Sequence, residues 1–504
     1  MMHTETEEYP PIPADAGQPP HPDLHSCASV LAISFQFVRQ HWLALTLISA
    51  LLLGPCFWHR YIVAGDLDSH MYNAWLAQLI ERGQAPGLWI ASQWSNMLFD
   101  ITVSNLGNIF GLPAAEKIAV SLAVLLFFWG EFSLVAACTR RAPWFLAPVL
   151  ATLAYGWTFQ AGFLNFYISL ALSFFSLAIF WRGRGAERFL ALAFAPFIWM
   201  AHPLGLAWLI AAAGYIVIAE HLPGRAQILL VSACAVLLAL VSWYLMKYLP
   251  GPSASLPGLA ANGSNQLLLF EPRYLLPTRL LLAFSIASLL TDILWKRDQP
   301  PTWSAYALPF QLYIVAILGV SMLPDAVGTS SSPAPLTLLT PRLSSICAIF
   351  GCCLLGAARP RKWHLIGFSA IAIIYFSFLY KDTATLVRME GQAEQLVSHL
   401  PLGSRVISTF RRPANIQLLS NHIVDRACIG RCFSYGNYEP ATGQFRVRAL
   451  PGNTIVAMNL EAAIATQDPH YVVPPQDPPL FEIYWCGGDK AEFCIREFPT
   501  GSPR

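Results

Sequence analysis

Charged residues are scarce in this chain of 504 residues. Only 12% of the residues are Asp, Glu, Lys or Arg, whereas 55% are hydrophobic. A soluble globular protein usually has about 25% charged residues, so most of this surface must face something other than water. Lipid is the simplest candidate, and we expect the chain to lie in a bilayer. The net charge of +2 is too small to attract nucleic acid, and we expect no nucleic-acid partner.

The chain also lacks the motifs that bind nucleotides. It contains neither a G-x-x-x-x-G-K-[ST] loop nor a dinucleotide fingerprint, which argues against ATP as an energy source and against a nucleotide sugar as a donor. A secretory signal peptide is not indicated either, because the first forty residues contain Glu5, Glu7 and Glu8, a proline-rich run, and no basic n-region. We interpret residues 1–40 as a mostly disordered cytoplasmic tail, in which residues around Val30 to Arg39 can form an amphipathic helix on the membrane surface.

Long apolar runs follow one another between residues 41 and 380, which we assign to a transmembrane domain. A helix needs about 20 apolar residues to cross the hydrocarbon core of a bilayer. On this basis we predict a polytopic α-helical membrane protein with about eleven crossings, and we place a bend at His202-Pro203 between the fifth and the sixth. The predicted spans are Trp42–Trp58, Ala114–Ala137, Trp144–Trp157, Gly162–Trp181, Phe189–Met200, Pro203–Ala219, Ile228–Tyr248, Leu276–Trp295, Trp303–Met322, Leu343–Ala358 and Leu365–Tyr380.

Basic residues are distributed unevenly among the loops. If the N-terminus is cytoplasmic, five short inside loops carry eleven Lys and Arg residues, as the positive-inside rule requires. The long segments 59–113, 249–275 and 323–341 then lie outside, together with residues 381–504. Extra length on one face predicts that the protein acts on that face. We therefore predict a cytoplasmic N-terminus and a periplasmic C-terminal domain.

The C-terminal segment, residues 381–504, is polar and contains short β-like runs, so we predict a small α+β domain. Helices are expected at Thr385–Leu400 and Asn459–Thr466. Strands are expected at Arg405–Phe410, Gln444–Arg448, Asn453–Met458, His470–Val473 and Leu480–Trp485.

Four of the eleven cysteines lie in this C-terminal segment. An even number in an exported domain indicates disulfides, most simply Cys428–Cys432 and Cys486–Cys494. A zinc site made of the four cysteines is the alternative. Neither pair has the C-x-x-C spacing that is common in zinc sites, so disulfides are favoured.

The first outside loop, residues 59–113, carries a polar cluster beside a predicted helix. Apolar residues between Met71 and Ile80 repeat at helical spacing, and Gly83 and Pro86 end the helix. Asp66, Asp68 and His70 precede or begin this helix. Asp68 is equally well explained as a plain N-cap and His70 as a surface residue, whereas Asp66 is harder to explain in this way. Two carboxylates and an imidazole this close together favour general-base chemistry or metal binding.

The order of these features resembles the GT-C superfamily of integral membrane glycosyltransferases. The chain has one span, followed by an outside loop with an acidic motif and an amphipathic helix that ends in Gly and Pro. Further spans and an outside C-terminal domain come next. The best match is the run Asp66-Leu-Asp68-Ser-His70 and the helix that continues to Gly83. The resemblance implies transfer of a sugar from a polyprenyl-phosphate carrier to a glycan, lipid or protein acceptor outside a bacterial inner membrane. It also implies that Asp66, with Asp68 as its neighbour, is the catalytic base or orients the acceptor hydroxyl.

One segment departs from that pattern. Many members of the superfamily have a Tyr-Pro-Pro-like segment before the second span, where this chain has the residues Trp94 to Asn108. The identity of the acceptor is therefore left open.

A transfer from a lipid phosphate also needs a cation or a metal at headgroup level, and the planar fork of arginine matches phosphate oxygens. Arg342 at the start of the tenth span is favoured, because the resemblance implies an outer-face arginine near the later spans. Arg273 and Tyr274 before the eighth span and His202 at the bend are further candidates for substrate binding. The alternatives are that the arginines only anchor helix ends at the interface and that His202 only caps a helix.

Two other functions are left open by the residues. A transporter or lipid flippase would carry internal repeats and charges near the membrane midplane, but we find no convincing repeat, and Glu131 is the main mid-span charge. A catalytically inactive scaffold is the third possibility. No set of metal ligands can be identified from the sequence, so the cofactor is unknown. A divalent metal is the alternative to an arginine as the group that binds the lipid phosphate.

Overall fold

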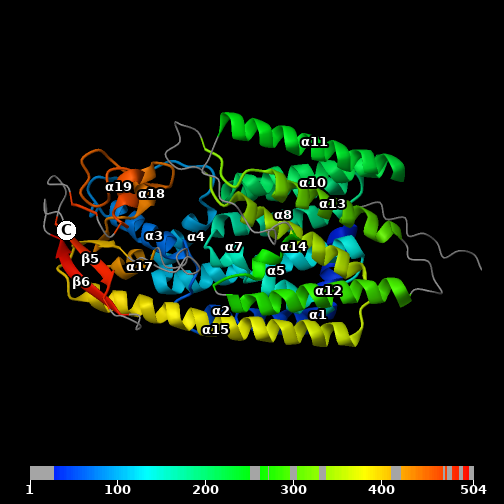
Figure 1. Ribbon diagram of the computed structural model, residues 1–504, viewed down its shortest axis with the longest axis horizontal. Coiled ribbons are helices and arrows are strands. Elements are labelled where there is room, and N and C mark those ends of the chain that lie inside the picture. The colour runs from blue at the N-terminus through cyan, green and yellow to red at the C-terminus, as the bar shows by residue number, and fades with distance from the viewer. Residues whose placement is uncertain are drawn as a thin grey trace, which may run out of the picture.

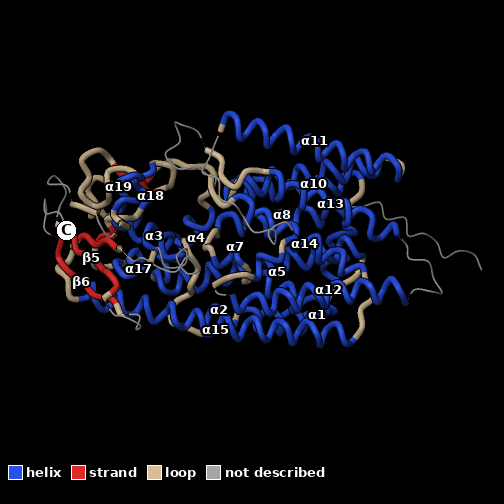
Figure 2. Tube along the Cα trace, in the orientation of Figure 1, coloured by secondary structure: helices blue, strands red, loops and turns tan. Residues whose placement is uncertain are grey.

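Helices make up most of the structure, as the long apolar runs predict. The computed structural model describes residues 28–249, 262–270, 272–295, 303–328, 336–409, 422–468, 471–473, 479–486 and 492–498. Long helices lie side by side along the longest axis of the molecule, and the four-stranded sheet lies at one end of that axis (Figures 1 and 2).

The helical elements have the following bounds. They are α1 Ala28–Leu52, α2 Gly54–Phe57, α3 Leu67–Glu81, α4 Leu98–Phe110, α5 Leu112–Thr139, η1 Trp144–Leu146, α6 Ala147–Ala154, α7 Trp157–Gln160, α8 Leu164–Arg182, η2 Gly185–Phe194, α9 Ala195–Ala201, α10 Pro203–His221, α11 Gly224–Tyr248, η4 Ser264–Leu267, η5 Pro272–Tyr274, α12 Leu275–Trp295, α13 Trp303–Met322, α14 Leu339–Ala357, α15 Lys362–Ser398, α17 Ile423–Cys428, α18 Tyr438–Thr442 and α19 Leu460–Ala465, where η marks a 3-10 helix.

Within the described ranges, seven helices are long and apolar enough to cross a membrane. They are Leu112–Thr139, Leu164–Arg182, Pro203–His221, Gly224–Tyr248, Pro272–Asp292, Leu339–Ala357 and Lys362–Ser398. Each of them contains most or all of one predicted span. The apolar stretch Tyr306–Met322 of α13 is shorter. The total of eleven crossings stays a prediction.

Two of the predicted spans are broken into short helices. In the segment Trp144–Trp157, α6 has 8 residues, and in Phe189–Met200 the chain forms the 3-10 helix η2 followed by α9 with 7 residues. A proline lies in the first turn of both α6 and α9, where it favours the start of a helix. At 1.5 Å per residue, helices this short cannot cross a bilayer by themselves.

The first helix begins before the predicted N-terminal boundary of the transmembrane domain. Helix α1 begins at Ala28, so part of the predicted tail, residues 28–40, is helical and continuous with the first span. Residues 1–27 lie outside the described part of the chain. The bend at His202 is found where we predicted it, because α9 ends at Ala201 and α10 begins at Pro203.

Helix α15 joins the membrane helices to the C-terminal domain without a break. It runs from Lys362 to Ser398, about 55 Å at 1.5 Å per residue, and the predicted boundary between residues 380 and 381 falls inside it. It packs against α6 and α12 in the bundle and against α17 and β6 in the domain. Figure 1 shows it as the yellow rod along one edge of the molecule.

The C-terminal domain contains a four-stranded sheet in the order β3-β2-β5-β6. Strand β2 (Arg405–Ser408) pairs in parallel with both β3 (Phe433–Ser434) and β5 (Leu480–Trp485), and β5 pairs antiparallel with β6 (Phe493–Phe498). The predicted strand at 480–485 is thus confirmed, and the one predicted at 405–410 is confirmed over Arg405–Ser408, while Phe410 lies outside the described residues. Residues 453–458 and the described residues 471–473 are not strands, and His470 lies outside the described residues.

A second, smaller sheet ties the first outside loop to this domain. Strand β1 (Leu88–Ile90) of the loop pairs antiparallel with β4 (Val447–Ala449), which lies in the predicted strand Gln444–Arg448. The turn before β1 requires glycine at position 87, because φ is +84° there and a Cβ would lie 2.8 Å from Cβ of Asn453. The loop and the domain therefore form one unit.

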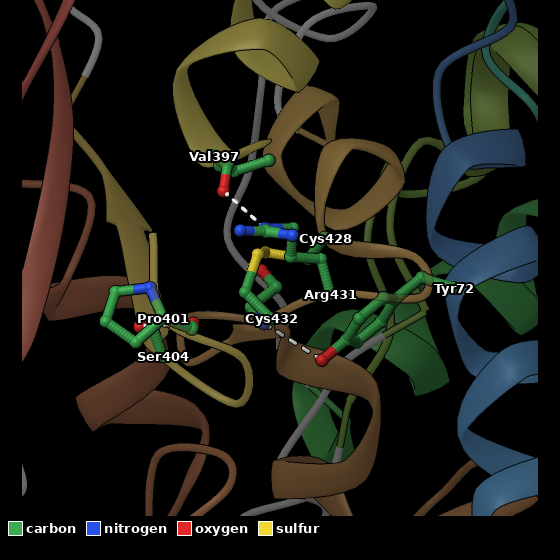
Figure 3. The surroundings of a disulfide bond; sticks show 8 residues. Tyr72, Val397, Pro401, Ser404, Cys428, Arg431 and Cys432 are labelled. Atoms are coloured by element: carbon green, nitrogen blue, oxygen red, sulfur yellow. Dashed lines mark hydrogen bonds between the residues drawn. A yellow bond between two sulfur atoms is a disulfide. The ribbon is translucent and has the colours of Figure 1, made fainter. Parts of the chain in front are cut away.

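Both predicted disulfides are present. Cys428 pairs with Cys432 and Cys486 with Cys494, with Cα–Cα distances of 4.6 and 5.7 Å. Figure 3 shows the first bond between α15 and α3. Beside it, the Arg431 guanidinium donates a hydrogen bond to the carbonyl of Val397 on α15. The Tyr72 hydroxyl of α3 accepts a hydrogen bond from the backbone amide of Ser434 in β3.

Candidate functional site

Asp66 lies immediately before α3, where the first outside loop becomes helical. The backbone amides of Gly65 and Asp66 donate to the carbonyls of Gln160 and Ala161, at 2.7 and 3.1 Å, so the end of α7 supports this turn. A Cβ at Gly162 would collide with the backbone of Asp66. Only glycine at position 162 allows the two segments to approach this closely.

The carboxylate of Asp66 is not engaged by its surroundings. It accepts no hydrogen bond from the residues that the structure describes, and 21% of its side chain is exposed. The Nε2 atom of His422, in the C-terminal domain, lies 3.7 Å from its Oδ1. Arg342 and Tyr438 both lie within range of its charge. Asp66 is therefore surrounded by groups from α14 and from the C-terminal domain.

Arg342 is a largely buried cation with unused hydrogen-bond donors. Its guanidinium carbon lies 3.6 Å from the ring centroid of Phe163 and 5.9 Å from that of Phe166. Stacking on an aromatic ring stabilises the charge but leaves the N–H groups free. The buried Nε has no partner, and the guanidinium makes no ion pair within the described ranges. An arginine in this state is prepared to bind an anion.

His422 is held in place from its other side. Its Nδ1 lies 2.6 Å from Oδ2 of Asp425, and the same oxygen accepts a hydrogen bond of 2.9 Å from Asn437. Burial alone lowers the pKa of His422, but the hydrogen bond and charge of Asp425, together with the charges of Asp66 and Glu439, outweigh it and raise the pKa to about 9. The imidazole is thus a cation at neutral pH.

Asp68 has a different environment from Asp66. Its Oδ1 accepts a hydrogen bond of 2.6 Å from Nε of Arg426, whose Nη1 donates to Glu116 at 2.7 Å. A third carboxylate, that of Glu390, lies 3.7 Å from Nε of the same arginine. All four side chains are buried. Asp68 therefore joins α3 to α5, α15 and the C-terminal domain through one guanidinium.

His70 forms a second buried pair. Its Nδ1 lies 2.7 Å from Asp100 of α4, and the other oxygen of Asp100 accepts from Asn165 at 2.8 Å. Burial lowers the pKa of His70, but the charge and hydrogen bond of Asp100 outweigh it and raise the pKa to about 9. Burial likewise opposes ionisation of Asp100, yet His70 and Asn165 keep the pKa of that carboxyl below its usual value. This pair joins α3, α4 and α8.

The remaining predicted residues lie in different places. Arg273 and Tyr274 both bind Asp382 of α15, the tyrosine at 2.7 Å, and so fix the start of α12 to that helix. His202 caps α10, because its Nδ1 accepts from the amide of Leu204 at 3.2 Å. Burial, and then the nearby charge of Arg342, lower the pKa of His202 to about 3. His202 therefore lies near Arg342.

Three functional candidates were missed from the sequence. His422, Asp425 and Glu390 lie in the C-terminal segment or at the end of α15, far along the chain from Asp66 and Asp68. Tyr438 and Arg426 belong to the aromatic and basic residues of the domain, but nothing near them in the sequence indicates which carboxylate they face. Contact between such distant residues follows from the docking of the domain, which leaves no local pattern.

A large apolar cavity lies among the helices. It has a volume of about 680 Å³ and is lined by residues of α6, η4, α12, α13 and α14, including Gly351 and Leu355. A second cavity, of about 10 Å³, lies between α3, α4 and the C-terminal domain, beside Asp100, Glu439 and Arg446. Neither of these two cavities is lined by Asp66 or Arg342.

Metal ligands are not grouped in the described part of the chain. Within it, no three His, Cys, Asp or Glu side chains are placed so that they could hold a metal ion. Two cationic side chains of this protein, Arg342 and His422, lie near Asp66.

Comparison with protein-family models, with curated proteins and with solved structures gives no match for this chain. The resemblance to the GT-C superfamily thus rests on the residues quoted above.

Replacement of Arg426 by Gln is expected to destabilise the protein strongly. The change leaves Asp68, Glu116 and Glu390 buried without a counter-charge, which typically costs about 3–5 kcal/mol in the free energy of unfolding. The matched control is Arg60→Gln, because Arg60 pairs with Glu394 at 3.1 Å but is 68% exposed. An exposed pair contributes about 0–1 kcal/mol. Thermal unfolding of the detergent-purified proteins measures both effects, and equal losses would contradict a structural role for Arg426.

The pair of His70 and Asp100 predicts a pH-dependent stability. Because folding raises the pKa of His70 from 6.5 to about 9, its contribution is complete below pH 6.5 and is lost as the pH rises through 9. We expect the difference in melting temperature between the wild type and His70→Gln to shrink over that range. The exposed His221, changed to Gln, is the control. A difference that stays constant with pH would contradict the ion pair.

Proposed function

We propose that this protein is a membrane glycosyltransferase that transfers a sugar from a polyprenyl-phosphate carrier to an acceptor on the extracytoplasmic face of a bacterial inner membrane. The observation that carries the proposal is that Asp66 and Arg342 lie within range of each other's charge although neither side chain is paired. Asp66 supplies a partly exposed carboxylate that accepts no hydrogen bond, and Arg342 supplies a guanidinium whose buried Nε has no acceptor. A general base and an anion-binding cation are the two groups that this transfer requires.

In the proposed reaction the carboxylate of Asp66 takes the proton of the acceptor hydroxyl. The hydroxyl oxygen forms a bond to the anomeric carbon, and the bond between that carbon and the phosphate oxygen breaks. The electron pair of the broken bond stays on the phosphate, which leaves as polyprenyl phosphate. Arg342 binds the phosphate and stabilises the charge that develops on it. The proton on Asp66 then returns to water.

The large cavity supports a lipid carrier. Helix α14 carries Arg342 in its first turn and lines the cavity from Ala348 to Leu355, so the cavity begins about 9 Å further along the same helix, at 1.5 Å per residue. Gly351 lies nine residues, or about two and a half turns, beyond Arg342, so the cavity lies against the opposite face of α14 and a carrier chain would have to pass round the helix to reach it. An isoprenoid chain suits the apolar lining.

Transport and a purely structural role remain the alternatives. Neither of them requires an unpaired carboxylate next to an unpaired guanidinium. The first experiment below separates both alternatives from the enzyme.

Replacement of Asp66 by Asn is expected to lower the rate of sugar transfer about 10²- to 10⁴-fold, the usual contribution of a general base. The assay follows transfer of label from a polyprenyl-phosphate sugar to acceptors in native membranes. Glu81→Gln, at the exposed far end of α3, is the control and is expected to keep the wild-type rate. An unchanged rate in Asp66→Asn would rule out its role as base, and no transfer by the wild type would favour the alternatives.

Replacement of Gly351 by Leu is expected to fill part of the cavity and to raise KM for carriers with long chains, while leaving carriers with short chains unaffected. A Cβ at position 351 meets only the Tyr313 ring, at 3.8 Å, so the change fits without a clash. Gly319→Leu on α13 is the matched control, since nothing lies within 4 Å of a Cβ there. Equal KM changes for short and long carriers would exclude the cavity as the chain site.

A further inference from the structure

Three hydrogen-bond donors face Asp66 from three different elements. They belong to Arg342 on α14, to His422 at the start of α17 and to Tyr438 on α18. The His422 and Tyr438 rings are neighbours, with their centroids 5.6 Å apart. Both residues lie within range of the charge of Asp66, and Tyr438 also within that of Arg342. The three donors therefore surround one small region.

None of these donors is used by the residues that the structure describes. The Nε2 of His422 is 3.7 Å from Asp66, which is too long for a hydrogen bond, and the hydroxyl of Tyr438 and the guanidinium of Arg342 have no acceptor there. His422 is only 7% exposed. The buried Nε of Arg342 has no partner, and a buried polar group without a partner is costly. A ligand that supplies acceptors at this place would satisfy it together with the two neighbouring donors.

The acidic neighbours of His422 have donors of their own. Asp425 is bound by His422 and Asn437, and Glu439 accepts from Ser69 at 2.8 Å. Asp66 is the acidic residue of this group that lacks a hydrogen-bond donor. The unused donors on the two cations are thus left for an added anion, and they lie beside the residue that we propose as the base.

We propose that Arg342, His422 and Tyr438 together form a phosphate-binding site, in which the C-terminal domain supplies two of the three donors. This inference rests on the proposed function and names the residues that bind its leaving group. A phosphate has enough oxygens to accept from all three donors at once. During transfer the bound phosphate changes from a diester to a monoester and gains negative charge. A cationic His422 then binds the departing phosphate more strongly than the substrate, as catalysis requires.

The competing explanation is that Arg342 and His422 only neutralise the charge of Asp66. The two explanations differ in what happens to a lipid phosphate when His422 is changed. Two replacements distinguish the roles of the two ring nitrogens of His422. In His422→Asn the amide keeps the place of Nδ1 and its bond to Asp425, whereas in His422→Gln the amide reaches the place of Nε2.

The experiment measures binding of a C55 polyprenyl phosphate to the full-length protein in detergent, by native mass spectrometry between pH 7.5 and 10. We expect His422→Asn to weaken binding about ten- to hundredfold, as for the loss of a charged hydrogen bond, and His422→Gln to restore part of it. Tyr438→Phe is expected to weaken binding less. Melting temperatures equal to that of the wild type show that each variant is folded.

The pH profile provides a second readout that a structural role would not change. Wild-type binding is expected to fall as the pH rises through about 9, because His422 then loses its proton. Asp66, Asp425, Glu439 and Tyr438 face this imidazole, and burial raises the pKa of Tyr438 well above its usual value of 10, beyond this range. Both His422 variants are expected to give flat profiles, whereas His70→Gln keeps the fall although its pKa is similar.

The outcomes separate this inference from the proposed function. Binding that depends on His422 in a protein that transfers no sugar supports the phosphate site and rejects the glycosyltransferase. Transfer that proceeds while polyprenyl phosphate binds equally well to the wild type and to His422→Asn overturns the phosphate site and leaves the glycosyltransferase standing.

Discussion

The buried guanidinium of Arg426 is the contact on which the rest of the site depends. It lies between carboxylates from the first outside loop, from α5 and from α15, while its own backbone belongs to the C-terminal domain. Burying a guanidinium with ionisable carboxyl groups is costly, and their mutual attraction offsets that cost only while all the partners are in place. The loop, the membrane helices and the domain must therefore dock together in a single arrangement.

This arrangement gives two neighbouring aspartates different properties. The carboxylate of Asp68 is bound by Arg426 in the ion network. Asp66, two residues earlier, instead faces a region with unused hydrogen-bond donors. The network holds the start of α3 in place, and the glycine at position 162 allows the chain before α3 to rest on the end of α7. A free carboxylate is therefore held by contacts that do not use its side chain. Such preorganisation is what general-base chemistry needs.

The features that could be predicted from the sequence are local ones. Apolar run length located the long helices, helical periodicity located α3, and spacings of four and eight residues gave both disulfides. Run length did not show that prolines in α6 and α9 begin new short helices inside two predicted spans. The pairing of β1 with β4 and the contact of Asp66 with His422 join residues more than 350 positions apart. No local pattern marks such contacts, because docking of the domain creates them. The number of crossings and their orientation stay predictions.

The uninterrupted course of α15 also bears on how such a protein can exchange its parts. A domain that begins after a flexible linker can be replaced by recombination at the linker. Here a cut after Tyr380 would divide one rigid helix, and the Asp382 that anchors the start of α12 would be lost with the outgoing piece. The structural module that contains the domain therefore begins at Lys362, so exchanging the domain would also exchange a helix that is long and apolar enough to cross a membrane.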